Sequence, residues 1–284
     1  MDHGRVVRRF TYGDTRAQYG VLELPPGAGP FAVVVLLHGG FWRLGFNRTL
    51  MNPLAHDLLG RGFAVWNVEY RRLGIGWGAG GGWPHTFDDV AAAIDLLADL
   101  DVPLDLSRVF AVGHSAGGQL ALWAAGRAGL PDGAPGAQPR VVLAGAVGQA
   151  AVCDLRAAYG ARSGNGVVRR LLGGSPRRVP ERYDLASPMA RLPLGVPVLL
   201  VHGDRDKVVS PSQSRDYAVA ARAAGDDVTL VVRAGEGHFE HLDAAGGAWS
   251  EVVRWLEASC PADGACSSDG GGRPLPLSAS RREP

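Results

Sequence analysis

The sequence has little of what marks disulfide-rich, secreted or membrane proteins. It contains only three cysteines, and their irregular spacing does not form a disulfide framework: Cys153, Cys260 and Cys266. No apolar run comes near the roughly 18 residues that a membrane-spanning helix needs, so we expect no membrane partner. The first residues, MDHGRVVRRFTYGD, include arginines but no apolar segment behind them, unlike a secretory signal. A cytoplasmic location is therefore the default expectation.

An excess of either charge is also missing. The chain has 29 basic and 28 acidic residues, a formal net charge of +1, which gives no reason to expect nucleic acid as a partner. The Gly-rich stretches at 78–82 and 270–272 do not match a phosphate-binding pattern. His202, Asp204 and Asp206 have the side chains of metal ligands but lack a partner cluster. We expect no cofactor and no metal, and the oligomeric state stays open.

What the sequence does have is a regular alternation of short apolar runs and helical patterns. This alternation is typical of an α/β fold with a mostly parallel central sheet and helices on both faces. We expect strands at residues 5–12, 17–23, 31–37, 63–70, 108–113, 141–147, 196–203 and 228–233. The first two of these strands should form an antiparallel hairpin. We expect helices at residues 48–60, 86–100, 115–127, 211–224 and 246–258.

The domain organisation follows from length and from two changes in composition. A chain of 284 residues fits one α/β domain with an insertion. Residues 152–194 are rich in Arg, Gly and Pro and contain only short helical pieces, which predicts a small cap above the sheet. From residue 260 onward large apolar residues almost vanish, so this segment cannot bury enough surface to fold. We expect one domain over 1–259 and a disordered tail over 260–284.

The strongest chemical signal is a G-x-S-x-G motif, Gly113-His114-Ser115-Ala116-Gly117. It follows an apolar strand and opens a helix, the context of a nucleophile elbow. A serine in so sharp a turn needs small neighbours, because strand and helix approach each other closely. The motif predicts Ser115 as a nucleophile.

A serine hydroxyl needs a base, and the base needs an acid that fixes its tautomer. His238 lies just past the last predicted strand, at the sheet edge where ligands bind in such folds. His241 is its nearest competitor, and a surface role suits it better. Asp204 and Asp206 both end the preceding strand, and Asp204 could instead cap a turn. With Asp206, the chain order is nucleophile, acid, base, which is the order expected for a fold with a nucleophile elbow.

The motif His38-Gly39-Gly40-Phe41-Trp42 follows the predicted strand 31–37. That position supplies one backbone N–H of an oxyanion hole, and the residue after the nucleophile, Ala116, supplies another. The sequence does not decide between the N–H groups of Gly40 and Phe41. We expect His38 to be a structural hydrogen-bonding residue beneath this loop.

Aromatic residues flank these loops and are candidates for a substrate pocket: Trp42, Trp83 and Phe239. Packing over the sheet edge is the alternative for each, because large aromatic side chains bury surface wherever they lie. Three arginines of the cap could meet a substrate carboxylate, although we expect them to lie on a solvated surface instead: Arg156, Arg162 and Arg169.

Four segments, HGGFW, GHSAGG, HGDRDKVV and GEGHF, occur in the order and approximate spacing found in α/β-hydrolases. Together with VEYRRLG and GGGWPHTFDDV, they make residues 15–258 resemble the esterase/arylformamidase branch, which is similar to kynurenine formamidase and to feruloyl or acetyl esterase-like hydrolases. The resemblance implies a triad of Ser115, Asp206 and His238. It also implies oxyanion donors from Gly40, Phe41 and Ala116.

These observations predict a serine hydrolase that cleaves a small acyl ester through an acyl-enzyme. Its partner would be a small-molecule substrate. An arylformamidase or amidase is the alternative within the enzymes, because fold and triad do not name a substrate. A non-catalytic binding protein of the same fold is a third possibility, although such proteins usually lack a triad member and this chain lacks none.

Overall fold

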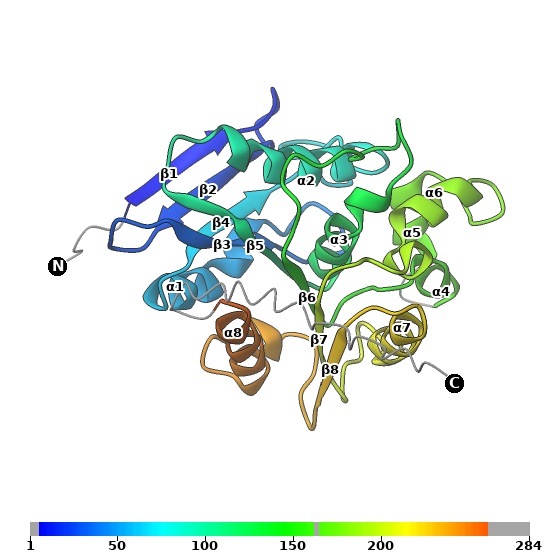
Figure 1. The fold of residues 1–284 in the computed structure, drawn as a ribbon. Coiled ribbons are helices and arrows are strands. Elements are labelled where there is room, and N and C mark those ends of the chain that lie inside the picture. The colour runs from blue at the N-terminus through cyan, green and yellow to red at the C-terminus, as the bar shows by residue number, and fades with distance from the viewer. Residues whose placement is uncertain (1–5, 162–164, 261–284) are drawn as a thin grey trace, which may run out of the picture.

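The structure is a computed structural model that describes residues 6–161 and 165–260. An eight-stranded sheet runs through the centre of this part of the chain (Figure 1). The strands are β1 (Val6–Thr11), β2 (Tyr19–Leu24), β3 (Phe31–Leu37), β4 (Ala64–Glu69), β5 (Leu104–His114), β6 (Gly145–Gln149), β7 (Val198–Gly203) and β8 (Val228–Arg233).

The strands follow the order β1-β2-β4-β3-β5-β6-β7-β8. The pairs β1/β2 and β2/β4 are antiparallel, and every other neighbouring pair is parallel. Six parallel strands therefore end at one edge, where the loops that follow them meet. The predicted entry hairpin and the mostly parallel sheet are confirmed.

Helices cover both faces of the sheet, with α1 and α8 on one face and α2, α3 and α7 on the other (Figure 1). Their bounds are α1 (Asn52–Gly60), α2 (His85–Asp95), α3 (Ala116–Ala125), α7 (Ser212–Ala223) and α8 (Gly247–Ser259). Short 3₁₀ turns are η1 (Arg48–Met51), η2 (Leu96–Asp99), η3 (Arg127–Gly129), η4 (Pro188–Arg191) and η5 (Glu240–Leu242).

Strand β3 shows why the sheet is buried on both faces. Val33, Val35 and Leu37 point into the core under α2 and α3, whereas Val34 and Leu36 point toward α1 and α8. Successive side chains of a strand alternate between faces, so a continuous apolar run is what a doubly covered strand requires. All five side chains are fully buried.

One strand lies later in the chain than the sequence predicts. We expected a strand at 141–147, but β6 spans Gly145–Gln149. Val141 and Leu143 are buried in the helix-covered core while Val142 is 54% exposed, so the first part of this apolar run is a connecting segment. An apolar run cannot by itself show where hydrogen-bonded pairing begins.

The segment between β6 and β7 holds three short helices, α4 (Leu155–Gly160), α5 (Asn165–Leu172) and α6 (Pro180–Ala186), beside α3 and α7 (Figure 1). Asp154 caps α4 by accepting hydrogen bonds from the backbone N–H groups of Arg156 and Ala157. The predicted tail beyond residue 260 lies outside the described residues. Within those residues, no helix is both long and apolar enough to cross a bilayer.

Candidate active site

Ser115 sits in the sharp turn between β5 and α3. Its φ of 57° lies in the left-handed region, which non-glycine residues adopt at a cost. The two flanking positions have no room for a side chain. A Cβ added at Gly113 would lie 2.0 Å from the Gly117 oxygen, and a Cβ added at Gly117 would lie 2.0 Å from the Leu37 oxygen. The close contact of β5, α3 and β3 therefore holds Ser115 at the carboxyl edge of the sheet.

His238 and Asp206 meet across two loops at that same edge. The His238 Nδ1 lies 2.7 Å from the Asp206 Oδ2, while the Asp206 Oδ1 accepts the backbone N–H groups of Val208 at 2.8 Å and Val209 at 2.9 Å. An ionised carboxylate accepts from Nδ1–H, which leaves His238 Nε2 free to accept a proton. Burial alone would raise the pKa of Asp206, but its hydrogen bonds from His202, His238 and Val209 outweigh burial and hold that pKa below the ordinary value.

Ser115 and His238 line one small cavity of about 270 Å³. Its other walls come from the segment after β3 through η1, from the end of β5 and from the base loop: Gly40, Phe41, Phe46, Leu50, His114 and Phe239. Within the described residues, no hydrogen bond joins the Ser115 hydroxyl to His238. Such bonds are often long without substrate and tighten when it binds.

Asp204 has a different environment from Asp206. It is exposed, and its Oδ1 accepts the backbone N–H of Gly235 at 2.8 Å. Asp204 therefore ties two loops together in the way that turn-capping aspartates do, and it does not contact His238.

A second histidine, His202, supports Asp206 from behind. Its Nε2 lies 3.2 Å from the Asp206 Oδ2 and 3.1 Å from the Val209 oxygen, and its Nδ1 lies 2.8 Å from the Ser214 hydroxyl. Two acceptors face Nε2, so this position suits an N–H donor there, with Nδ1 accepting from the Ser214 hydroxyl. His202 is fully buried, so this contact is shielded from water. The sequence analysis considered His202 only as a metal ligand and missed this position.

The loop after β3 packs directly on the elbow. A Cβ at Gly39 would lie 2.9 Å from the His114 oxygen and 3.2 Å from the Ser115 Cβ. The three residues Gly40, Phe41 and Trp42 all have positive φ, at 111°, 54° and 53°. This unusual backbone turns the loop sharply beside Ser115. Gly40 and Phe41 line the same cavity as Ser115, and Ala116 follows Ser115 as the first residue of α3.

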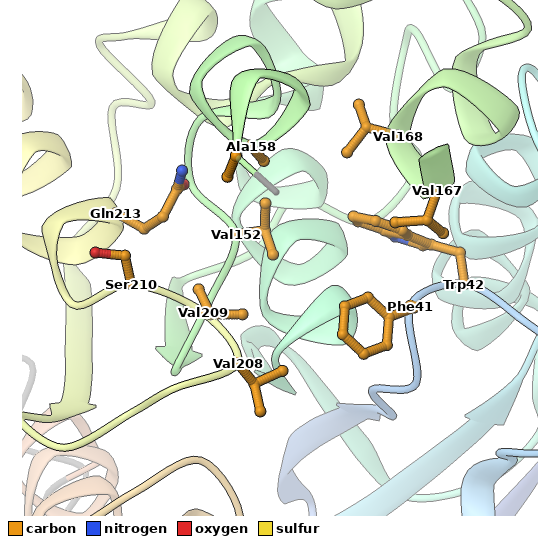
Figure 2. Close-up of a pocket in the computed structure, with 11 residues that line it drawn as sticks. Phe41, Trp42, Val152, Ala158, Val167, Val168, Val208, Val209, Ser210 and Gln213 are labelled. Atoms are coloured by element: carbon orange, nitrogen blue, oxygen red, sulfur yellow. The ribbon is translucent and has the colours of Figure 1, made fainter. Parts of the chain in front are cut away.

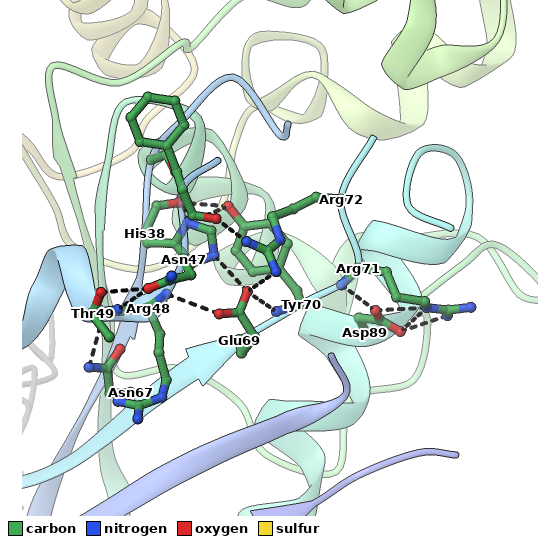
Figure 3. A network of polar contacts seen from close by, with 12 residues as sticks. His38, Asn47, Arg48, Thr49, Asn67, Glu69, Tyr70, Arg71, Arg72 and Asp89 are labelled. Carbon is green, nitrogen blue, oxygen red and sulfur yellow. Dashed lines mark hydrogen bonds and ion pairs between the residues drawn. The ribbon is translucent and has the colours of Figure 1, made fainter. Parts of the chain in front are cut away.

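A buried carboxylate, Glu69, fixes that loop from below (Figure 3). It lies 3.2 Å from His38 Nε2 and 3.1 Å from Arg72 Nη2, and it accepts the Arg48 backbone N–H at 3.1 Å. Burial raises the pKa of Glu69, but the contacts with His38 and Arg72 outweigh it and leave that pKa below the ordinary value. The Tyr70 hydroxyl also donates to the His38 oxygen at 2.6 Å. His38 is thus a hydrogen-bonding support beneath the loop.

A larger apolar cavity opens between this loop and the cap (Figure 2). It encloses about 420 Å³ including its mouth, with Phe41 and Trp42 on one side and Val209, Ser210 and Gln213 on the other. The remaining walls are Val152, Ala158, Ala161, Val167, Val168 and Val208. Phe41 borders this cavity and the one that holds Ser115, so the two cavities are neighbours.

The three predicted pocket aromatics have different positions. Trp42 lines the larger cavity while its Nε1 donates to Gln119 Oε1 at 3.0 Å. Phe239 lines the cavity of Ser115 and is 59% exposed. Trp83 lines neither cavity; it packs on Phe87 with ring centroids 5.0 Å apart. The aliphatic walls from α4 and α5 were not foreseen, because their sequence shows no chemical motif.

Two further histidines lie beneath the site in buried positions. His114 Nε2 lies 2.8 Å from the His238 oxygen, and burial lowers the pKa of His114 to about 3. His241 is fully buried, and burial lowers its pKa to about 4. Within the described part of the chain, neither ring nitrogen of His241 has a hydrogen-bond partner. The surface role expected for His241 is therefore wrong.

Comparisons with known proteins agree with this architecture. The model of the BD-FAE family matches residues 22–220. Esterase LipC of Mycobacterium tuberculosis is 29% identical over 263 residues, which cover 86% of this chain and 63% of that protein. The chain thus spans less than two thirds of the length of this curated relative.

Two solved structures resemble the fold closely. A truncated carbohydrate esterase from gut microbiota is 20% identical with a TM-score of 0.75, covering 90% of this chain and 95% of that one. Esterase 2 of Thermogutta terrifontis, phosphonylated by sarin, is 21% identical with a TM-score of 0.73, covering 91% and 94%. The predicted α/β-hydrolase fold is confirmed.

Proposed function

The chain belongs to the BD-FAE family of α/β-hydrolases, and from this premise we propose that it is a serine hydrolase that cleaves small acyl esters. In this proposal Ser115 is the nucleophile, His238 the general base and Asp206 the acid that orients it. The relative LipC and two structural neighbours carry the name esterase, which supports the same class of reaction.

The observation that carries the proposal is the 2.7 Å contact between Asp206 and His238 at the wall of the cavity that contains Ser115. With Nδ1 bonded to Asp206, Nε2 is the His238 nitrogen that would accept a proton. The Ser115 oxygen attacks the ester carbonyl carbon while its proton passes to Nε2. The C–O bond to the alcohol then breaks, and the alcohol takes the proton from His238. Water attacks the acyl-enzyme, gives its proton to His238, and the acid leaves as Ser115 is reprotonated.

The loop after β3 supports the same chemistry. Negative charge develops on the carbonyl oxygen during each attack, and preorganised N–H donors stabilise it. The Ala116 N–H begins a helix, where backbone donors are unpaired and the helix dipole is positive. We assign the second donor to the Gly40–Phe41 segment, which Glu69 and His38 hold against the elbow. Loss of one such donor costs about 3–4 kcal/mol in other hydrolases.

The apolar cavities favour a small acyl or aromatic group. The larger one has only Ser210 and Gln213 as polar wall residues, and both polar ends of Gln213 are already bonded to the Asp154 backbone. An ester also expels a better leaving group than an amide, which needs protonation of its nitrogen. The ester reaction is therefore preferred over the arylformamidase alternative.

The decisive experiment compares wild type with Ser115→Ala in hydrolysis of 4-nitrophenyl acetate and butyrate and of an aryl formamide. We expect the variant to lose about 10⁴-fold or more in kcat, because the nucleophile is gone. A fluorophosphonate probe should label wild type and not the variant. The matched control Ser107→Ala, an exposed serine on β5, should be labelled like wild type.

Circular dichroism should show an unchanged melting temperature for both variants. Labelling that persists in Ser115→Ala would contradict the nucleophile. A higher kcat/KM for the formamide than for every ester would replace the esterase by the formamidase.

A further inference from the structure

A third hollow opens at the rim of the site, beside the cap. It spans about 600 Å³ with its open mouth and is lined by Phe41, Arg43, Gly166, Val167 and Arg170. Phe41 also borders the cavity of Ser115, and Phe41 and Val167 also border the apolar cavity. A substrate whose carbonyl lies at Ser115 can therefore reach this hollow past Phe41.

Both arginines of the hollow present free guanidinium groups. Among the described residues, neither Arg43 nor Arg170 has a hydrogen-bond or ion-pair partner for its side chain, and no acidic side chain lines the hollow. Other arginines of the same region are paired: Arg71 lies 2.6 Å from Asp89, and Arg156 lies 2.6 Å from Asp184. Two unpaired positive charges thus face one concave, water-accessible space.

The backbones that carry these arginines are held by one segment. The Leu73 N–H donates to the Trp42 oxygen at 2.7 Å, and the Leu44 N–H donates to the Leu73 oxygen at 3.0 Å, on either side of Arg43. The Trp83 N–H donates to the Leu171 oxygen at 2.6 Å, next to Arg170. Because residues 71–84 bond to the backbone next to both arginines, the distance between the Cα atoms of Arg43 and Arg170 is fixed before a ligand binds. This lowers the entropic cost of binding.

We propose that Arg43 and Arg170 form a subsite for a carboxylate carried by the substrate, at a distance from the scissile ester. A guanidinium presents paired N–H donors that match a carboxylate, and the apolar wall of Phe41 and Val167 accommodates the part between that group and the ester. The inference rests on the proposed esterase function and names its substrate class: esters that carry an acidic group beyond an apolar or aromatic spacer.

A structural explanation covers part of these observations. Arg169 and Arg170 both lie in the last turn of α5, where positive charge complements the helix dipole. That explanation applies equally to Arg169, which is exposed and does not line the hollow. It does not apply to Arg43, which belongs to no helix. Arg169 is therefore the matched control.

The test uses two pairs of neutral and acidic esters. One pair places the charge on the acyl side, ethyl 4-carboxybenzoate against ethyl 4-carbamoylbenzoate. The other places it on the leaving group, the acetates of 4-hydroxyphenylacetic acid and of its amide. The quantity compared is the ratio of kcat/KM for acid over amide in wild type, in the double variant Arg43→Met/Arg170→Met and in Arg169→Met, so that intrinsic reactivities cancel.

We expect the ratio for at least one pair to fall about five- to twentyfold in the double variant, mainly through KM, because two exposed charge pairs are lost. In wild type the ratio should also fall when salt is raised, since exposed charges are screened. Arg169→Met should keep the wild-type ratio.

Equal ratios in wild type and the double variant for both pairs would overturn the subsite. An equal fall of the ratio in Arg169→Met would show that any positive charge in this region has the same effect, and it would overturn the subsite as well. In both cases the amide esters are still hydrolysed and the fluorophosphonate probe still labels Ser115. Absence of hydrolysis and of labelling would instead remove the proposed function, and the subsite with it.

Discussion

The two sides of the site are built from different interactions. On the base side, Asp206 accepts hydrogen bonds from His238, from His202 and from two backbone N–H groups, so its direction is fixed by short polar contacts. On the cap side, the walls are aliphatic side chains such as Ala158 and Val167, which only pack. Hydrogen bonds demand a particular partner, whereas apolar packing demands little more than volume.

This difference separates what the reaction needs from what selects the substrate. A change on the base side removes a partner from a buried polar group, which carries the full cost of leaving that group unsatisfied. A change on the cap side alters the shape of a cavity whose walls come from the short helices α4 and α5, from α7 and from loops. We therefore expect base-side variants to affect every substrate and cap-side variants to affect the choice among substrates.

The largest effect is expected at the acid. Asp206→Asn should lower kcat by about 10⁴-fold, because the amide no longer holds His238 in the correct tautomer. Asp204→Asn is the control: among the described residues, the exposed Asp204 side chain accepts a hydrogen bond from the Gly235 N–H and from no other group, so the loss of activity should be small. Steady-state rates of both variants on 4-nitrophenyl acetate decide whether Asp206 or Asp204 is the acid. A greater loss in Asp204→Asn would reverse the assignment.

His241 differs from these base-side residues, because neither of its buried ring nitrogens has a hydrogen-bond partner in the part of the chain that the structure describes. Its effect should therefore be on stability. Its pKa of about 4 lies below the value of about 6.5 expected when unfolded, so the unfolded chain binds the proton first as pH falls. Folding stability is therefore lost progressively below pH 6.5, by about 3 kcal/mol once the pH has passed the folded-state value.

His241→Phe removes this titration, so its melting temperature should fall less than that of wild type between pH 7 and pH 4.5. The exposed His85→Gln should behave as wild type does. An unchanged pH dependence in His241→Phe would show that the acid sensitivity comes from other groups.

The contact behind Asp206 predicts a smaller effect. His202→Leu removes one hydrogen bond to a charged carboxylate, which should lower kcat/KM by about tenfold for all esters alike. It should also raise the pKa of Asp206 toward its ordinary value, because the His202 hydrogen bond lowers it. The acid limb of kcat/KM, which belongs to the Asp206–His238 pair as a unit, then moves to higher pH.

His202→Gln keeps a donor near the position of Nε2 and should restore part of the rate and of the pH profile. Equal losses in the Leu and Gln variants, with an unmoved acid limb, would mean that His202 only fills space.

The smallest effect is expected on the cap side. Ala158→Leu fills part of the apolar cavity and should lower the preference for butyrate over acetate esters by up to about tenfold, since each methylene excluded forfeits about 0.8 kcal/mol. Ala157→Leu, on the exposed side of the same helix, should leave the preference unchanged. A parallel loss on acetate and butyrate would show that the cavity does not hold the acyl chain.

The sequence predicted the parts of the fold whose signal is local. The run VTLVVR predicts a strand at 228–233, and β8 has these same bounds. The start of β6 could not be predicted, because it depends on where β5 and β7 offer hydrogen bonds and not on where the apolar run begins. The elbow, the acid loop and the base loop were located from motifs because each is confined to a few consecutive residues.

The residues that hold the site in place could not be predicted from local sequence patterns. Glu69 reaches His38 across 31 positions in the chain and Arg48 across 21, so no local pattern links them. His202 stands only four positions before Asp206, but its role depends on Ser214 and on burial. The cap-side walls depend on how α4 and α5 pack. The spacing of Val167, Val168, Leu171 and Leu172 indicates an apolar face on α5, but it does not indicate which cavity that face borders.

The contact at Gly117 has a further consequence for how the protein can change over time. With only 2.0 Å between an ideal Cβ there and the Leu37 oxygen, the proposed nucleophile Ser115 and the loop after β3 form one mechanical unit. Rearrangements of α4 or α5 do not pass through this contact. New substrate preferences can therefore accumulate in the cap by gradual drift while the alignment of attacking atom and charge-stabilising backbone is inherited unaltered.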